Sequence, residues 1–126
     1  MGNRAVLTHY SSNNAPCIYL HWNGGRDSVA AFLHAARYLG LPPPTTERAW
    51  DLFAKILAKH FFGGKVGMTI YREKFGEADK DNWDNGVYYI DRDWRICGRE
   101  FNRHQEQYDP ETTSGIFEHI TGAFKA

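Results

Sequence analysis

The sequence has little of three things that mark specialised classes of protein: cysteine, net charge and long apolar runs. Its two cysteines, Cys17 and Cys97, lie in predicted strands without metal-like spacing, so we expect buried, reduced thiols in a cytoplasmic protein. Lys and Arg number fifteen, as do Asp and Glu, and this balance argues against non-specific binding to duplex nucleic acid. No apolar run approaches the length of about 18 residues that a membrane span needs, and we expect no secretion signal.

Familiar catalytic and cofactor motifs are also lacking. The Asn-Gly-Gly-Arg-Asp-Ser stretch has no P-loop lysine, and neither G-x-G-x-x-G nor G-x-S-x-G occurs. A calcium loop built around Gly86 would place Trp83 and Arg92 at ligand positions, so that interpretation fails. No histidine has a helical i, i+4 histidine partner or a neighbouring cysteine. We therefore expect no catalytic residue, no metal and no cofactor, and a protein that is not an enzyme.

Aromatic residues are the compositional surplus, with four Trp, seven Tyr and eight Phe in 126 residues. A chain of this length predicts a single domain, residues 1–126, in which only some of these rings are core. The remainder would suit a subunit interface or a flat ligand.

Hydrophobic periodicity divides the chain into strands and helices in separate runs. Alternation and helical spacing, with Gly and Pro as boundaries, predict five strands, two central helices and a C-terminal helix. The predicted strands are Arg4–Tyr10, Cys17–Trp22, Val66–Tyr71, Val87–Ile90 and Trp94–Phe101, and the predicted helices are Ser28–Leu39, one from Thr45 or Thr46 to about Phe61, and Glu111–Lys125. Residues 73–85 read as a loop. The fold class is α+β with an antiparallel sheet of about five strands.

One stretch, Leu20 to Val29, offers a candidate anion site. A strand, an Asn-Gly-Gly turn and a helix start leave backbone N–H groups pointing outward, with Trp22 and Arg26 beside them. Asp27 or Ser28 is expected to cap the helix. The same residues also fit a tight strand-to-helix turn with an exposed arginine, and the sequence leaves both interpretations open.

Two further groups could contribute to a ligand site. Asn82, Asp84 and Asn85 offer groups that read base edges and ribose hydroxyls, and Trp83 offers a stacking face. The alternative is turn chemistry that shapes a hairpin. Arg99, on a later strand, could clamp a phosphate or stack on a purine, or could be an ordinary surface residue. Together the three groups suggest a site for a phosphorylated, base-containing small molecule.

Several segments, in order, resemble a family of small proteins encoded by phages and other bacterial mobile elements. They are Met-Gly-Asn-Arg-Ala-Val at the start, Leu-His-Trp-Asn-Gly-Gly-Arg-Asp-Ser-Val, Phe-Phe-Gly-Gly after the second predicted helix, and Asp-Asn-Gly before a strand. We identify this family with the phage anti-Thoeris sponges. That resemblance implies a homodimer or higher homo-oligomer that sequesters, without cleaving, a cyclic ADP-ribose-type signal and also cyclic oligonucleotides of CBASS immunity.

The resemblance also implies a set of ligand-binding residues. Asn82 and Asp84 would supply an Asn-x-Asp pair, Arg99 the arginine that follows it, Tyr71 the aromatic ring, and Arg48 an arginine from a neighbouring subunit. Trp22 and Arg26 would be pocket or interface residues. Arg99→Ala and Asp84→Ala are then expected to keep the fold and to weaken signal binding at least about tenfold.

Two other functions remain open on the sequence. One is an anti-CRISPR-like protein that blocks a host immune protein through its aromatic surface, and the other is a small nucleotide-processing enzyme.

Overall fold

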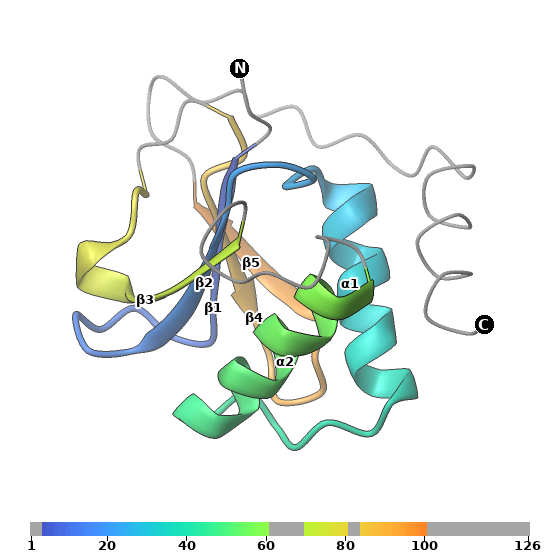
Figure 1. The fold of residues 1–126 in the computed structure, drawn as a ribbon. Coiled ribbons are helices and arrows are strands. Elements are labelled where there is room, and N and C mark those ends of the chain that lie inside the picture. Colours follow the sequence, from blue (N-terminus) through green and yellow to red (C-terminus); the bar gives the residue numbers. More distant parts are fainter. Residues whose placement is uncertain (1–3, 61–69, 81–83, 101–126) are drawn as a thin grey trace.

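A five-stranded sheet with two helices on one side forms the framework of the protein (Figure 1). The computed structural model describes residues 4–60, 70–80 and 84–100. The strands are β1 (Ala5–Thr8), β2 (Pro16–Leu20), β3 (Ile70–Lys74), β4 (Val87–Ile90) and β5 (Ile96–Glu100); the helices are α1 (Arg26–Tyr38), α2 (Glu47–His60) and the short 3₁₀ helix η1 (Phe75–Glu77). The α+β class predicted from the sequence is confirmed.

The sheet is mixed, so the prediction of a purely antiparallel sheet was wrong in this respect. Its strand order is β3-β2-β1-β4-β5, and β1 pairs with β4 in parallel while the other three pairs are antiparallel. After β3 on one edge the chain crosses to the other side of β1, where the Val6 amide donates to the Gly86 carbonyl at 2.9 Å. Sequence periodicity contains no information about this crossing, because it describes strands one at a time.

The strands alternate between two hydrophobic clusters, one on each face of the sheet. On the helical face, Leu7, Ile18 and Tyr88 pack with residues of α1 and α2. On the opposite face, Val6, Cys17 and neighbouring side chains pack against η1, which lies on that side (Figure 1). Both faces of the central strands are therefore buried.

The two long helices begin differently from each other. In α1 the N-cap is Gly25, so Asp27 and Ser28 lie within the first turn and the prediction that one of them caps the helix was wrong. In α2 the Ala49 amide donates to the Thr46 hydroxyl at 3.2 Å, which confirms a helix start at Thr46. Gly40, with φ +70°, follows the C-cap residue Leu39, and its left-handed backbone conformation is one that glycine adopts readily at the end of a helix.

Two of the tryptophans are core residues that bond to the segment between α1 and α2, which contains Pro42, Pro43 and Pro44. The Trp50 and Trp94 rings are in contact, with centroids 5.3 Å apart and planes tilted by 59°. Their indole N–H groups donate to the Pro44 and Pro42 carbonyls at 3.0 and 2.9 Å. Trp94 adopts φ +58°, so it belongs to the turn before β5 rather than to the predicted strand.

Three other sequence predictions are corrected or lie beyond the described residues. Residues 73 and 74 continue β3, and η1 follows within the segment predicted to be a loop. Cys17 is buried as predicted, but the prediction was wrong for Cys97, which is exposed on the edge strand β5 at the point where its pairing with β4 shifts register. The predicted C-terminal helix, Glu111–Lys125, lies outside the described residues. Among the helices described, none has the length and apolar character to cross a membrane.

Candidate functional site

The predicted site residues lie mainly around one end of the sheet, which we call the turn-rich end. There β1 and β4 begin and β2 and β5 end, so segments far apart in sequence are neighbours. The turn-rich end comprises Arg4, His21–Gly25, Asp84–Gly86 and Arg99–Glu100. α1 starts beside it, at Arg26.

Asp84 and Asn85 hold the start of β1. The Asp84 carboxylate accepts from the backbone N–H and the side-chain Nε of Arg4, at 3.0 and 2.8 Å. Asn85 donates to the Arg4 carbonyl through both its backbone N–H and its side-chain amide, at 3.0 Å each. The ion pair with Asp84 raises the pKa of Arg4 above its ordinary value. These contacts favour a role for Asp84 and Asn85 in shaping the chain over a role in binding a ligand. Asn82 lies outside the described residues.

Arg99 also contacts its own chain. Its guanidinium stacks 3.7 Å above the Tyr88 ring centroid, and its Nη2 donates to the Asn85 carbonyl at 2.8 Å. The Tyr88 hydroxyl donates in turn to the Gly24 carbonyl at 2.8 Å. Arg99 is thereby connected to the Asn-Gly-Gly turn, and these contacts fix its side chain.

Two other predicted site residues lie apart from the turn-rich end: Tyr71 is on the face of the sheet opposite the helices, and Arg48 is on α2. Tyr71 pairs across the strands with Tyr19 on the opposite face of the sheet, with ring centroids 5.9 Å apart. It lines a small cavity of about 160 Å³ together with Tyr19, Glu73, Glu77 and Asp79. Three carboxylates make that cavity unfavourable for a phosphate. Arg48 is exposed in the first turn of α2.

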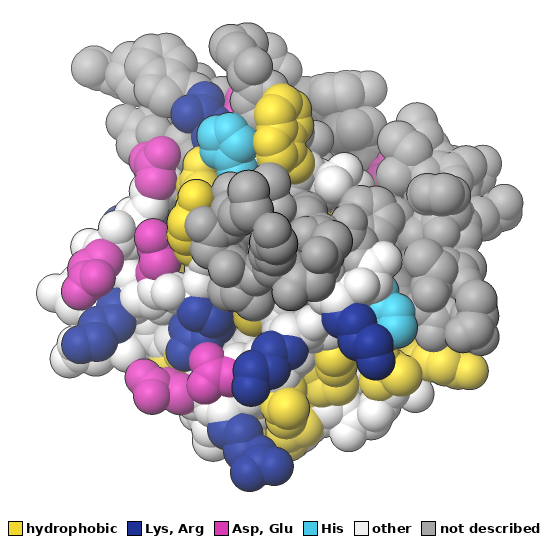
Figure 2. All heavy atoms as spheres, in the orientation of Figure 1, with side chains coloured by type: hydrophobic (Ala, Val, Ile, Leu, Met, Phe, Trp, Pro, Cys, Tyr) yellow, Lys and Arg dark blue, Asp and Glu magenta, His cyan; other side chains and the backbone are white. Residues whose placement is uncertain are grey.

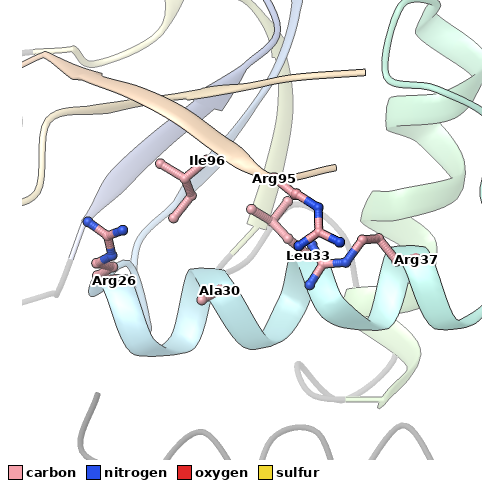
Figure 3. Close-up of a pocket in the computed structure, with 6 residues that line it drawn as sticks. All are labelled: Arg26, Ala30, Leu33, Arg37, Arg95 and Ile96. Carbon is pink, nitrogen blue, oxygen red and sulfur yellow. The ribbon is translucent and has the colours of Figure 1, made fainter. Parts of the chain in front are cut away.

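A larger groove runs between α1 and β5, and we call it the arginine groove. It has a volume of about 300 Å³, and Figure 3 shows its lining side chains: Arg26, Ala30, Leu33, Arg37, Arg95 and Ile96. Three of the six are arginines and none is acidic, while Ala30, Leu33 and Ile96 provide an apolar floor. Such a groove suits a ligand that combines anionic groups with an apolar or aromatic body.

Arg26 connects the arginine groove to the stretch singled out from the sequence. It is the first residue of α1, where the backbone N–H groups of a helix favour an anion. Trp22, four residues earlier, is 43 % exposed, and it contacts His21 edge to face with centroids 5.4 Å apart. A stacking surface and a cation thus lie on the same short turn.

Arg37 and Arg95 are site candidates that the sequence analysis missed. Arg37 follows Arg26 by eleven residues on α1, about three helical turns, so both project to the same side of the helix. This spacing was readable from the sequence as the series 26, 30, 33 and 37. Arg95 was not readable, because it reaches the groove only through the pairing of β5 with β4.

The surroundings of Arg37 are electrostatically unfavourable for a cation. Burial lowers the pKa of Arg37, and the like charge of Arg95 lowers it further, while Asp91 opposes both effects. Its Nη1 donates to the Trp94 carbonyl at 2.6 Å. An anion between the two arginines would relieve their mutual repulsion.

Comparison with protein-family models, with curated proteins and with solved structures found no match for this chain.

Proposed function

We propose that this protein binds and sequesters, without cleaving it, a phosphorylated, base-containing signal in the arginine groove. The observation that carries the proposal is the lining of that groove, which among the described residues has three arginines around an apolar floor and no acidic side chain. Guanidinium groups bind phosphates through paired, charge-assisted hydrogen bonds. Trp22, exposed on the turn that precedes Arg26, offers a face on which a base can stack.

The resemblance to the phage anti-Thoeris sponges suggests the biological role of such binding. The protein would be a phage-encoded sponge in the cytoplasm of an infected bacterium. It would capture a cyclic ADP-ribose-type signal of Thoeris immunity or a cyclic oligonucleotide of CBASS immunity. The binding step needs no catalytic group, metal or cofactor.

Affinity sets a requirement on how the site is enclosed. A sponge needs nanomolar binding, on the order of −12 kcal/mol. For a ligand of about 35 heavy atoms this is about −0.35 kcal/mol per atom, which requires an enclosed pocket. A groove of about 300 Å³ is at the lower end of the volumes that hold such ligands. A second copy of the chain, closing the groove in a homodimer or larger homo-oligomer, would supply the rest.

The direct test is a thermal-shift panel of cyclic nucleotides, followed by calorimetry on any compound that stabilises the protein. We expect Arg26→Gln to weaken binding at least about tenfold, because it removes charge-assisted hydrogen bonds from the groove. Arg92→Gln is the matched control, since Arg92 is exposed in the turn between β4 and β5 and does not line the groove. Equal affinity of the two variants would place the ligand elsewhere.

A second candidate function rests on a different observation. Tyr38 and Leu39, adjacent at the end of α1, are 58 and 43 % exposed, and Tyr10, after β1, is 47 % exposed. Figure 2 shows hydrophobic side chains gathered at the surface near the end of α1, and adjoining exposed apolar residues can mark an interaction surface. They would suit an anti-CRISPR-like protein that docks on a host immune protein. A stoichiometric complex with a host protein, together with no thermal shift from any nucleotide, would favour this function over the sponge.

A further inference from the structure

Arg37 and Arg95 lie at the end of the arginine groove farthest from Arg26. Arg37 is in the last turn of α1, and Arg95 immediately precedes β5. Figure 3 shows the two side chains reaching toward each other across the groove, while Arg26 lies at the other end. Eleven residues of α-helix separate Arg26 from Arg37, about 16 Å along the helix axis.

A structural role explains Arg37, but it does not explain why the guanidinium of Arg95 lies near that of Arg37. A cation in the last turn of a helix is favoured by the helix dipole, and the bond from Arg37 to the Trp94 carbonyl ties α1 to the turn before β5. That bond uses one of the five N–H donors of a guanidinium. A second guanidinium beside the first adds repulsion without adding to either role.

The acidic group that acts on Arg37 is already engaged with the turn. Asp91 is the carboxylate that acts on Arg37, and its Oδ1 accepts from the backbone N–H groups of Asp93 and Arg95 at 2.9 and 3.0 Å. It therefore shapes the loop that presents Arg95. The arrangement places two guanidinium groups around one point of the groove, which is how proteins hold a phosphoryl group.

We propose that Arg37 and Arg95 form a second anion subsite, which binds one phosphoryl group of a ligand whose other phosphoryl group lies at Arg26. This inference rests on the proposed function and narrows the class of ligand. The groove then favours a molecule whose two phosphoryl groups are separated by a nucleoside or more. Of the two signals proposed above, a cyclic oligonucleotide meets this condition, whereas the two phosphoryl groups of cyclic ADP-ribose are adjacent and would occupy one end. A mononucleotide fills only one end of it.

The test compares ligands with one and with two separated phosphoryl groups. The probes are AMP, cyclic di-AMP and inorganic phosphate, measured by calorimetry at one fixed ionic strength because charged contacts depend on salt. The proteins are the wild type, Arg95→Gln, the double variant Arg37→Gln/Arg95→Gln, and the control Arg92→Gln. Arg95→Gln keeps the test valid if loss of the Arg37–Trp94 bond unfolds the double variant, because Arg95 is exposed.

We expect the wild type and Arg92→Gln to bind cyclic di-AMP at least about tenfold more tightly than AMP. Arg95→Gln should reduce this preference for cyclic di-AMP, and the double variant should abolish it. A preference that survives in both subsite variants overturns the inference, and if Arg26→Gln also weakens nucleotide binding the proposed function still stands. If the wild type binds inorganic phosphate but no nucleotide, and Arg95→Gln loses that phosphate, the subsite stands and the proposed function fails. Binding of neither probe by the wild type overturns both.

Discussion

The guanidinium carbon of Arg99 lies 3.7 Å from the centroid of the Tyr88 ring, and this contact joins segments that the sequence presents as separate. Tyr88 donates its hydroxyl to the Gly24 carbonyl, and Arg99 donates to the Asn85 carbonyl, each at 2.8 Å. The Asn-Gly-Gly turn, the segment before β4 and the end of β5 are therefore held as one unit. Arg26 emerges from that unit at the start of α1.

Arg99→Ala tests how far this arginine serves the fold. The sequence alone led us to expect an intact fold and weaker binding, but the contacts of Arg99 lead us to expect a loss of stability as well. Removing the stacking on Tyr88 and the bond to Asn85 should lower the free energy of unfolding by about 1–2 kcal/mol. Urea unfolding measures this, with the exposed Arg92→Ala as the control. An unchanged urea midpoint for Arg99→Ala would show that its contacts with Tyr88 and Asn85 do not stabilise the fold.

Tyr88→Phe isolates the bond to the Asn-Gly-Gly turn. The side chain of Tyr88 is buried, and the substitution leaves the Gly24 carbonyl without this donor while keeping the ring beneath Arg99. We expect unfolding to become easier by about 1–3 kcal/mol. Tyr38→Phe, at a residue 58 % exposed, should change stability by less than about 0.5 kcal/mol. Similar effects of the two variants would show that the Tyr88 hydroxyl contributes nothing to holding the turn.

Much of the fold could be predicted from local patterns. The hairpin of β1 and β2, the start of α2 at Thr46 and the stop at Gly40 follow from alternation, capping chemistry and glycine. The parallel pairing of β1 with β4 could not be predicted in this way, because it depends on where the chain returns after β3. Trp94 was misassigned because strand propensity favours tryptophan, whereas in the structure this residue has a positive φ in the turn before β5 and packs against Trp50.

The candidate site could be predicted only in part. Arg26 and Trp22 were identified from the turn that precedes α1, and that turn does adjoin a groove suited to an anion. Asp84 was selected for its type, and the structure pairs it with Arg4, a contact between residues eighty positions apart. Partners at such separations are fixed by topology, which residue type and spacing do not report.

Glu73, on β3, should make the stability of the protein depend on pH. Burial raises the pKa of Glu73 above its usual 4.5, and Glu77 and Asp79 raise it further while Lys80 opposes them. At pH 7 the folded protein therefore holds a carboxylate whose ionised form it disfavours, which costs stability. Below pH 4.5 the group is protonated in both the folded and the unfolded state, and this cost disappears.

Glu73→Gln should accordingly stabilise the protein at pH 7, and the gain should shrink as the pH falls through the raised pKa toward 4.5. The gain should be below about 1 kcal/mol, because solvent screens a group this accessible. Chemical unfolding of both proteins at pH 7 and at pH 4 measures the difference. A gain that does not depend on pH would mean that the amide acts through packing and not through charge.

A protein that sequesters its ligand without cleaving it must release that ligand chemically intact, and this can be measured directly. The protein is mixed with cyclic ADP-ribose isomers or with cyclic oligonucleotides, freed of unbound nucleotide and denatured by heat, and the released compound is identified by mass spectrometry. We expect the wild type to retain one of these compounds and to release it intact, and Arg26→Gln to retain less of it. Recovery of a cleaved product, or retention of no nucleotide at all, would contradict the proposed function.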